Sequence, residues 1–154
     1  MIRKIAKYIG EFKKDTILTP LFVIIEVFLE VAIPYLMSMI IDNGIGNENI
    51  KYVVVVGLIM LVTAFLSLTC GVLSGKYGAS ASAGFARNLR REMYYNIQNY
   101  SFSNIDKYST AGLVTRLTTD VSNVQNAFQM IIRIAVRAPI MLISAMVMSF
   151  KINS

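Results

Sequence analysis

Three long apolar segments dominate the pattern of hydrophobic and polar residues along the chain. They cover residues 17–41, 53–75 and 130–150, and each exceeds the roughly 18 residues that a helix needs to cross a bilayer. The pattern therefore predicts an all-α membrane protein with three transmembrane helices. For the third segment a core helix of a soluble protein is the alternative, because its uncharged stretch, 138–150, is too short to cross alone.

Basic residues are distributed unevenly between these segments, which predicts the orientation of the chain in the membrane. Before the first span there are five: Arg3, Lys4, Lys7, Lys13 and Lys14. The 42–52 loop has only Lys51, whereas six lie in 76–128: Lys76, Arg87, Arg90, Arg91, Lys107 and Arg116. Basic loops mark the cytoplasmic side. We therefore expect a multi-pass protein of the plasma membrane with a cytoplasmic N-terminus, and with the 42–52 loop and the C-terminus outside.

The first 15 residues form a segment of their own. Ile2, Ile5, Ile9 and Phe12 recur at helical spacing with lysines between them, which predicts an amphipathic helix on the inner membrane surface over residues 1–15. A solvated terminus is the alternative. A cleaved signal peptide is disfavoured, because its apolar core would be about 7–15 residues long and 17–41 is longer.

The connection between the second and third spans, about 76–129, is too long for a simple hairpin. Its apolar residues recur at helical spacing: Phe85, Leu89, Met93, Ile97, then Leu113, Leu117, Val121, Val124 and Phe128. We predict that the second span continues as a helix to about residue 100, and that a second helix, capped by Ser109 and Thr110, rises into the third span. The two arms would be on the order of 35 and 30 Å long, as an antiparallel pair requires.

A short helix is predicted at the tip between the arms. Ser103 and Asp106 have the S-x-x-D spacing of a capping box. Phe102, Ile105 and Tyr108 recur every three residues and would face one side of this helix. An apolar-faced helix held some 30 Å from the membrane suits docking onto a cytoplasmic partner. Packing against its own arms is the alternative.

Small residues and prolines interrupt the apolar segments. Gly71 and Gly75 have the G-x-x-x-G spacing that lets membrane helices approach closely; flexibility at the membrane interface is the alternative. Pro34 in the first span and Pro139 in the third each remove a backbone donor, which favours a kink.

Four charges fall inside the predicted spans, in two pairs one helical turn apart. Glu26 and Glu30 lie in the first span, Arg133 and Arg137 in the third. Charges in a bilayer face protein or water and usually have a partner. Glu26 would lie about 13 Å deep and Arg137 about 10 Å, so we predict a structural contact between them. Glu30 has no evident partner here and is expected to face a water-filled cavity; alternatively, all four charges pair with helices outside this chain.

Composition narrows the function classes. The 154 residues are 55% hydrophobic and 16% charged, with a mean hydropathy of +0.57 and a net charge of +6. A soluble enzyme, a disordered chain and a nucleic-acid-binding tail are disfavoured. Without histidine and with a single cysteine, Cys70, the chain has no ligand set of the zinc type. No phosphate loop occurs, since Gly71–Lys76 has the wrong spacing. We expect no catalytic residues, and no metal or cofactor bound by this chain.

Two stretches resemble ABC exporters of the multidrug type. Residues 34–45, PYLMSMIIDNGI, are similar to the end of their first membrane helix. Residues 102–110, FSNIDKYST, and 113–121, LVTRLTTDV, resemble their first intracellular loop, in which R-L-x-x-D-V is a frequent pattern. In one departure, Thr110-Ala111-Gly112 stands where many members have Thr-Gly before an acidic residue.

The resemblance covers the whole chain and implies the type-1 exporter fold. Residues 16–154 would be half of a six-helix transmembrane domain, so the chain corresponds to a fragment or a truncated gene product. The coupling helix that rests on a nucleotide-binding domain would comprise Ser103, Asn104, Ile105, Asp106, Lys107 and Tyr108. ATP and magnesium would bind that partner domain. The resemblance further implies export of multidrug-type, lipid-like or other small molecules by a homodimer or heterodimer.

Two other functions remain open from the sequence. One is a small proton-coupled drug exporter that uses Glu26 or Glu30 as its exchanging carboxylate; the long arms argue against it. The other is a membrane scaffold whose arms dock a cytoplasmic protein without transport.

Overall fold

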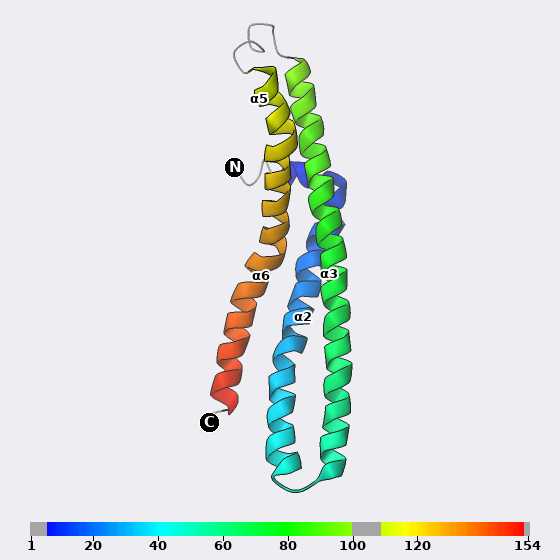
Figure 1. Ribbon diagram of the computed structural model, residues 1–154, viewed down its shortest axis with the longest axis vertical. Helices are drawn as coiled ribbons and strands as arrows, with labels where there is room; N and C mark the ends of the chain where they lie inside the picture. The colour runs from blue at the N-terminus through cyan, green and yellow to red at the C-terminus, as the bar shows by residue number, and fades with distance from the viewer. Residues whose placement is uncertain (1–5, 100–108, 153–154) are drawn as a thin grey trace.

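The computed structural model describes residues 6–99 and 109–152, and the elements in these ranges are all helical (Figure 1). In chain order they are η1 (Ala6–Phe12), α2 (Lys13–Met39), η2 (Ile40–Ile45), α3 (Ile50–Gln98), α5 (Thr110–Thr115), η3 (Arg116–Asp120) and α6 (Val121–Ile152). η1 is a 3-10 helix, whereas η2 and η3 are π-helical turns. The predicted all-α class is confirmed.

α3 is one uninterrupted helix of 49 residues. At 1.5 Å per residue it is about 74 Å long. The side chain of Asn49 caps its start by accepting a hydrogen bond from the Tyr52 N–H at 3.2 Å. No proline interrupts it, and it extends well past the beginning of α2 (Figure 1). The prediction that the second span continues as a helix is confirmed.

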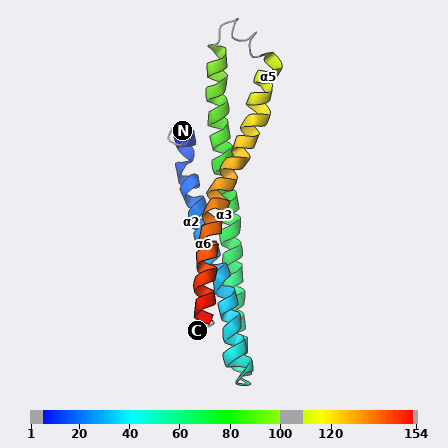
Figure 2. The same ribbon diagram turned by 90° about the vertical axis from the view of Figure 1, so that its left-hand side faces the viewer.

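α5, η3 and α6 follow one another without a break and form a second long rod antiparallel to α3. Ser109 caps the start of this rod, since its hydroxyl oxygen accepts a hydrogen bond from the Gly112 N–H at 3.2 Å. We call residues 76–98 and 110–129 the distal arms. They lie side by side at their base and diverge toward their ends (Figure 2), and the predicted helical pair is confirmed.

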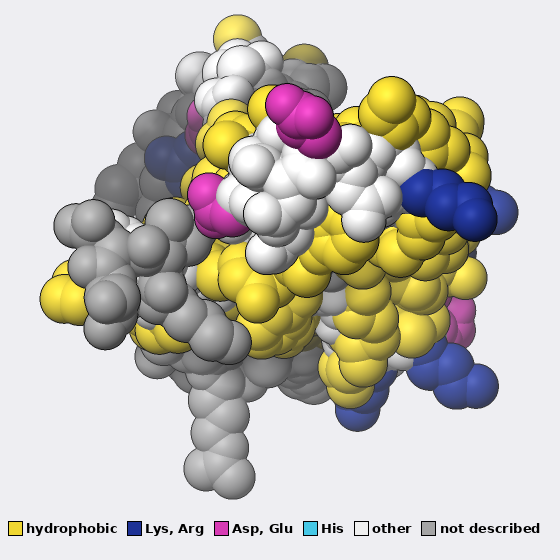
Figure 3. Space-filling model, turned by 90° about the horizontal axis from the view of Figure 1, so that it is seen from below, with side chains coloured by type: hydrophobic (Ala, Val, Ile, Leu, Met, Phe, Trp, Pro, Cys, Tyr) yellow, Lys and Arg dark blue, Asp and Glu magenta, His cyan; other side chains and the backbone are white. Residues whose placement is uncertain are grey.

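Three helical stretches are long and apolar enough to cross a membrane: Tyr8–Ile45, Ile50–Gln98 and Ala111–Phe150. Many of their large apolar side chains point outward; Phe65, for example, is 68% exposed. Seen from the end with the 46–49 connection, apolar side chains surround a small polar and acidic cap (Figure 3). Such a surface suits lipid contact. The exact span boundaries stay a prediction.

Residues 6–15 do not form the single regular amphipathic helix expected over 1–15. η1 is broken at Gly10, whose φ of 49° and ψ of −116° are non-helical, and α2 begins only at Lys13. A positive φ is easily reached by glycine because it has no Cβ. The chain therefore bends before α2; residues 1–5 lie outside the described residues.

The bend brings the N-terminal segment against α3. The Asn88 amide donates to the Tyr8 carbonyl at 2.9 Å, and the Ser80 hydroxyl donates to the Asp15 carboxylate at 2.5 Å. The Phe12 ring lies directly on Gly84, where a Cβ would overlap it. The apolar pattern predicted that Phe12 faces the inner membrane surface. Phe12 instead packs against α3, which is a protein surface.

Replacing Gly84 with alanine is expected to displace the N-terminal segment from α3. The added methyl group would overlap the Phe12 ring, and overpacking of this kind costs about 1–3 kcal/mol. Limited trypsin digestion should therefore cut faster after Lys13 and Lys14.

The variant Phe12→Ala lacks the ring that an alanine at position 84 would meet. The double variant Phe12→Ala/Gly84→Ala should therefore be digested at the same rate as Phe12→Ala alone. Gly57→Ala on the same helix is the matched control, since nothing lies within 4 Å of its added Cβ. Equal digestion of the Gly84 and Gly57 variants would contradict the proposed contact.

Candidate functional site

A three-residue charge cluster joins α2 to α6. The Nη1 of Arg137 donates to Glu26 Oε1 at 3.0 Å, and its Nη2 donates to both carboxylate oxygens of Glu30 at 2.8 Å. The predicted contact between Glu26 and Arg137 is thus confirmed. Glu26 is 8% exposed, so the cluster is a partly buried structural link between the first and third long helices.

The expectation that Glu30 has no partner in this chain is wrong. A guanidinium group presents several N–H donors in a planar fork. Because Glu26 and Glu30 lie one helical turn apart on α2, the single fork of Arg137 reaches both carboxylates. Glu30 does face a cavity of about 450 Å³, which Glu26 and Arg133 also line.

The glycines of α3 make room for side chains from its neighbours. A Cβ at Gly71 would lie 3.0 Å from Glu26 Oε1, and one at Gly78 would lie 3.3 Å from Thr19 Cγ2. The predicted close packing is confirmed at Gly71 but not at Gly75, where the nearest atom to an added Cβ would be Arg133 Nη1 at 4.0 Å. The close approach, however, is between a side chain and a backbone, which the G-x-x-x-G spacing does not specify.

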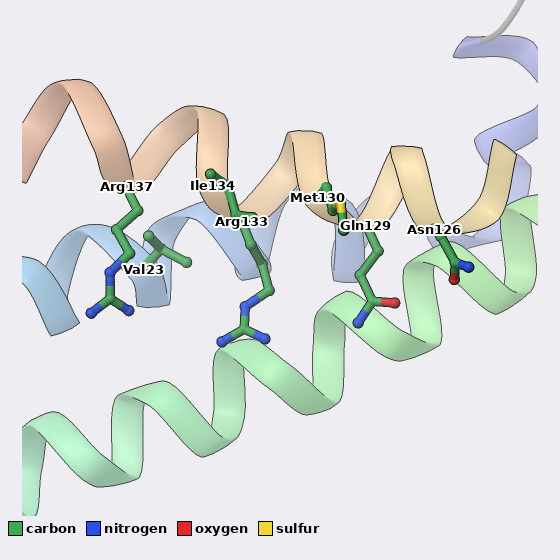
Figure 4. A pocket seen from close by; sticks show the side chains of 7 residues that line it. All are labelled: Val23, Asn126, Gln129, Met130, Arg133, Ile134 and Arg137. Atoms are coloured by element: carbon green, nitrogen blue, oxygen red, sulfur yellow. The ribbon is translucent and has the colours of Figure 1, made fainter. Parts of the chain in front are cut away.

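Unlike Arg137, Arg133 has no polar partner in the part of the chain that the structure describes. Its side chain extends from α6 toward α3 (Figure 4), where its Cδ would be 3.6 Å from a Cβ at Gly78. Within 6–99 and 109–152 it makes neither an ion pair nor a hydrogen bond. It lines a cavity of about 520 Å³ together with Val23, Gln129, Met130 and others.

The distal arms are joined by an aromatic stack and a cation. Phe85 and Phe128 stack with ring centroids 4.6 Å apart, and Phe85 is only 2% exposed. Arg90 donates from Nε to the Leu117 carbonyl at 3.2 Å and from Nη2 to the Ser122 hydroxyl at 3.0 Å. These contacts couple the outgoing helix to the returning one.

The π-helical turn η3 coincides with the Arg116-to-Asp120 part of the R-L-x-x-D-V motif. The Val121 N–H donates to the carbonyls of Arg116 and Thr118 and passes over that of Leu117, which accepts from Arg90 instead. Insertions of this type often occur at functional positions. Apart from the motif itself, no feature of the residue pattern indicated this turn.

The predicted coupling helix lies outside the described residues. This applies to Ser103, Asn104, Ile105, Asp106, Lys107 and Tyr108. In the described part, no group of three or more His, Cys, Asp or Glu side chains could hold a metal ion, and the thiol of Cys70 is free and half-buried.

Comparison with known proteins finds matches to ABC transporters that cover most of this chain. Residues 16–154 match the model of the ABC transporter transmembrane region. The chain is 34% identical over 128 residues to an uncharacterized ABC transporter ATP-binding protein of Bacillus subtilis, a match that covers 83% of this chain and 22% of the relative.

Two more distant relatives cover more of the chain. An uncharacterized ABC transporter ATP-binding protein of Mycobacterium tuberculosis is 24% identical over 97% of this chain and 26% of its own length. An ATP-dependent lipid A-core flippase of Vibrio parahaemolyticus is 23% identical over 96% of this chain and 25% of its own length. The chain spans about a quarter of the length of these relatives.

Proposed function

The chain belongs to the ABC transporter transmembrane region family, as its motifs predicted, and from this premise we propose that it is the membrane-domain part of an ATP-driven exporter. The distal arms carry the movement of a nucleotide-binding domain to the membrane helices. The substrate is a multidrug-type, lipid-like or other small molecule; the Vibrio parahaemolyticus relative is named as a flippase of lipid A-core.

The length and continuity of α3 carry this proposal. Its roughly 74 Å is more than twice the approximately 30 Å thickness of the hydrocarbon core. More than half of a helix of this length must therefore lie outside the hydrocarbon. A membrane anchor does not need such a long extension, whereas a mechanical link to a partner domain does.

The contacts between the arms make them suitable for transmitting force. The Phe85–Phe128 stack and the Arg90 hydrogen bonds hold the two arms together near the membrane. α6 continues from this contact to Arg137, which is bound to α2. A displacement at the tip thus reaches α2 through packed, hydrogen-bonded groups, as rigid-body switching requires.

ATP chemistry belongs to the partner in this proposal. The chain has no phosphate loop, so we propose that it does not hydrolyse ATP and that ATP and magnesium bind the nucleotide-binding domain. A homodimer or heterodimer completes the transporter. The N-terminus and the distal arms lie on the cytoplasmic side, since the basic residues concentrate there.

The rival proton-coupled mechanism has less support. Both candidate carboxylates, Glu26 and Glu30, are engaged by Arg137, and that contact would have to break at each proton exchange. The non-transporting scaffold would use the same distal arms, but its partner would not be an ATPase and no substrate would cross the membrane.

Cysteine crosslinking in the assembled transporter tests the proposal. Ile105→Cys is expected to crosslink to the nucleotide-binding domain, with a yield that changes when ATP is added. Asn47→Cys is the control, because Asn47 lies in the connection before α3, at the opposite end of that helix from the distal arms. Labelling of a cysteine at Lys107 from outside the cell would overturn the proposal.

A further inference from the structure

The distal arms are closely packed on the side of η3 that continues into α6, and they are open beyond it. On the packed side, Phe85 and Val121 are each 2% exposed. On the open side, the side chains of Met93, Ile97 and Leu113 are only half-buried and line a cavity of about 130 Å³ between the arms. Among the described helices, only η3 comes close to the backbone of α5, which leans away from α3 (Figure 2). The direction of α5 therefore depends on η3.

The π register of η3 takes a backbone donor away from one carbonyl. In a regular α-helix the Val121 N–H would donate to the Leu117 carbonyl, but here it donates to the carbonyls of Arg116 and Thr118. A π turn holds one residue more than an α turn. A change of register would therefore turn the helix beyond η3 by about 100° and shift it by about 1.5 Å, which is the step of one residue.

Arg90 of α3 supplies the missing donor. Its Nε donates to the Leu117 carbonyl at 3.2 Å, and its Nη2 donates to the Ser122 hydroxyl at 3.0 Å. The Ser122 hydroxyl in turn donates to the Thr118 carbonyl at 2.9 Å. One guanidinium thus holds two consecutive carbonyls of η3, one directly and one through a hydroxyl. A shift of η3 to the α register would return the Leu117 carbonyl to the backbone ladder and break its bond to Arg90.

We propose that Arg90 is a positioning residue for coupling, which locks η3 in the π register so that α5 moves together with α6 as one rod. Without this lock, η3 changes register and α5 turns without moving α6. The inference rests on the proposed function for the statement that movement enters at the tip of the arms. The lock itself involves only contacts between α3 and the returning helix.

Hydrogen–deuterium exchange of the assembled transporter, without ATP, tests the lock. Arg90→Gln is expected to raise the exchange rate of the backbone amides in 116–121 about tenfold, which corresponds to the loss of one hydrogen bond from a charged donor. Arg91→Gln is the matched control, because Arg91 is the next residue of α3 but lies over the Tyr95 ring of its own helix. It should leave this exchange rate unchanged.

Deletion of Thr119 distinguishes a lock on the register from a simple contact between the arms. Because a π turn holds one extra residue, the shortened chain is expected to form a continuous α-helix in which the backbone satisfies the Leu117 carbonyl. Arg90→Gln should then no longer change the exchange rate. Thr119→Ala is the matched control, since it removes the same exposed side chain but keeps the extra residue, and Arg90→Gln should keep its tenfold effect in that background.

Paired hydrolysis and transport assays measure the consequence for coupling. Arg90→Gln should retain ATP hydrolysis and lose most ATP-driven transport, and deletion of Thr119 should restore transport in that background. Equal exchange in Arg90→Gln and Arg91→Gln, or an effect of Arg90→Gln that persists after the deletion, would overturn the lock. Faster exchange with unchanged transport would overturn its role in coupling.

The double variant decides the case in which Arg90→Gln does not fold. Folding that is restored by deletion of Thr119 would support the lock, whereas a double variant that also fails to fold would overturn it. Failure of the proposed function would appear in the Ile105 crosslinking instead. The exchange measurement needs no nucleotide, so it remains interpretable in that case.

Discussion

Replacing Arg137 with glutamine should lower the free energy of unfolding by about 3 kcal/mol, the low end of the range for breaking a buried ion pair. The reason is that Glu26 and Glu30 would both lose their counter-ion while Glu26 stays 8% exposed. The side chain of Arg137 is itself 35% exposed, which keeps the loss at that low end. Unfolding titrations in mixed micelles measure it.

Two further variants separate the ion pair from general damage to α6. Arg133→Gln, one helical turn away, removes a guanidinium that has no carboxylate partner in the described chain. It should lower the free energy of unfolding by less than about 1 kcal/mol. The triple variant Glu26→Gln/Glu30→Gln/Arg137→Gln removes every charge of the cluster, and should recover more than half of the loss. A triple variant as unstable as Arg137→Gln would contradict the role assigned to the pairing.

Replacing Phe85 with alanine should separate the distal arms and cost about 3 kcal/mol, as for other buried phenylalanines. Phe85 is 2% exposed and stacks on Phe128, so its loss leaves a cavity where the arms meet. The same change should weaken coupling: ATP hydrolysis in the assembled transporter continues while ATP-driven transport falls. Thermal unfolding and paired hydrolysis and transport assays measure the two effects.

Phe65→Ala is the matched control for this experiment. It makes the same chemical change on the same helix, but at a side chain that is 68% exposed, so we expect little loss of stability within this chain. If Phe85→Ala and Phe65→Ala have equal effects on coupling, the arm contact does not transmit movement and the mechanical proposal is wrong.

The sequence predicted the long helices because their signals extend over many residues. Residues 53–75 are 23 uncharged and predominantly apolar residues, and apolar residues then continue at helical spacing through Phe85 and Leu89, which predicts one continuous helix. The contact between Glu26 and Arg137 was predictable for a similar reason: helices that cross the same membrane place charges at comparable depths, and a buried charge needs a partner.

Short-range geometry accounts for what the sequence did not predict. The apolar spacing that ends at Phe12 satisfies an amphipathic helix equally well whether or not Gly10 adopts a positive φ, so the bend was invisible. The partner of Glu30 was missed because the spacing of residues does not show that the single guanidinium of Arg137 can reach two carboxylates. η3 shifts a hydrogen-bond register without changing the apolar period, and therefore leaves no trace in the sequence pattern.

The ion pair between α2 and α6 has a consequence for biosynthesis. Glu26 and its partner Arg137 are separated by 111 positions in the chain. At synthesis rates of roughly 5–20 residues per second, the carboxylates wait on the order of 5–20 s for their counter-ion to be made. During this interval the newly made α2 carries two acidic groups without their partner. We therefore expect α2 to leave the insertion machinery for the lipid only after α6 has been made.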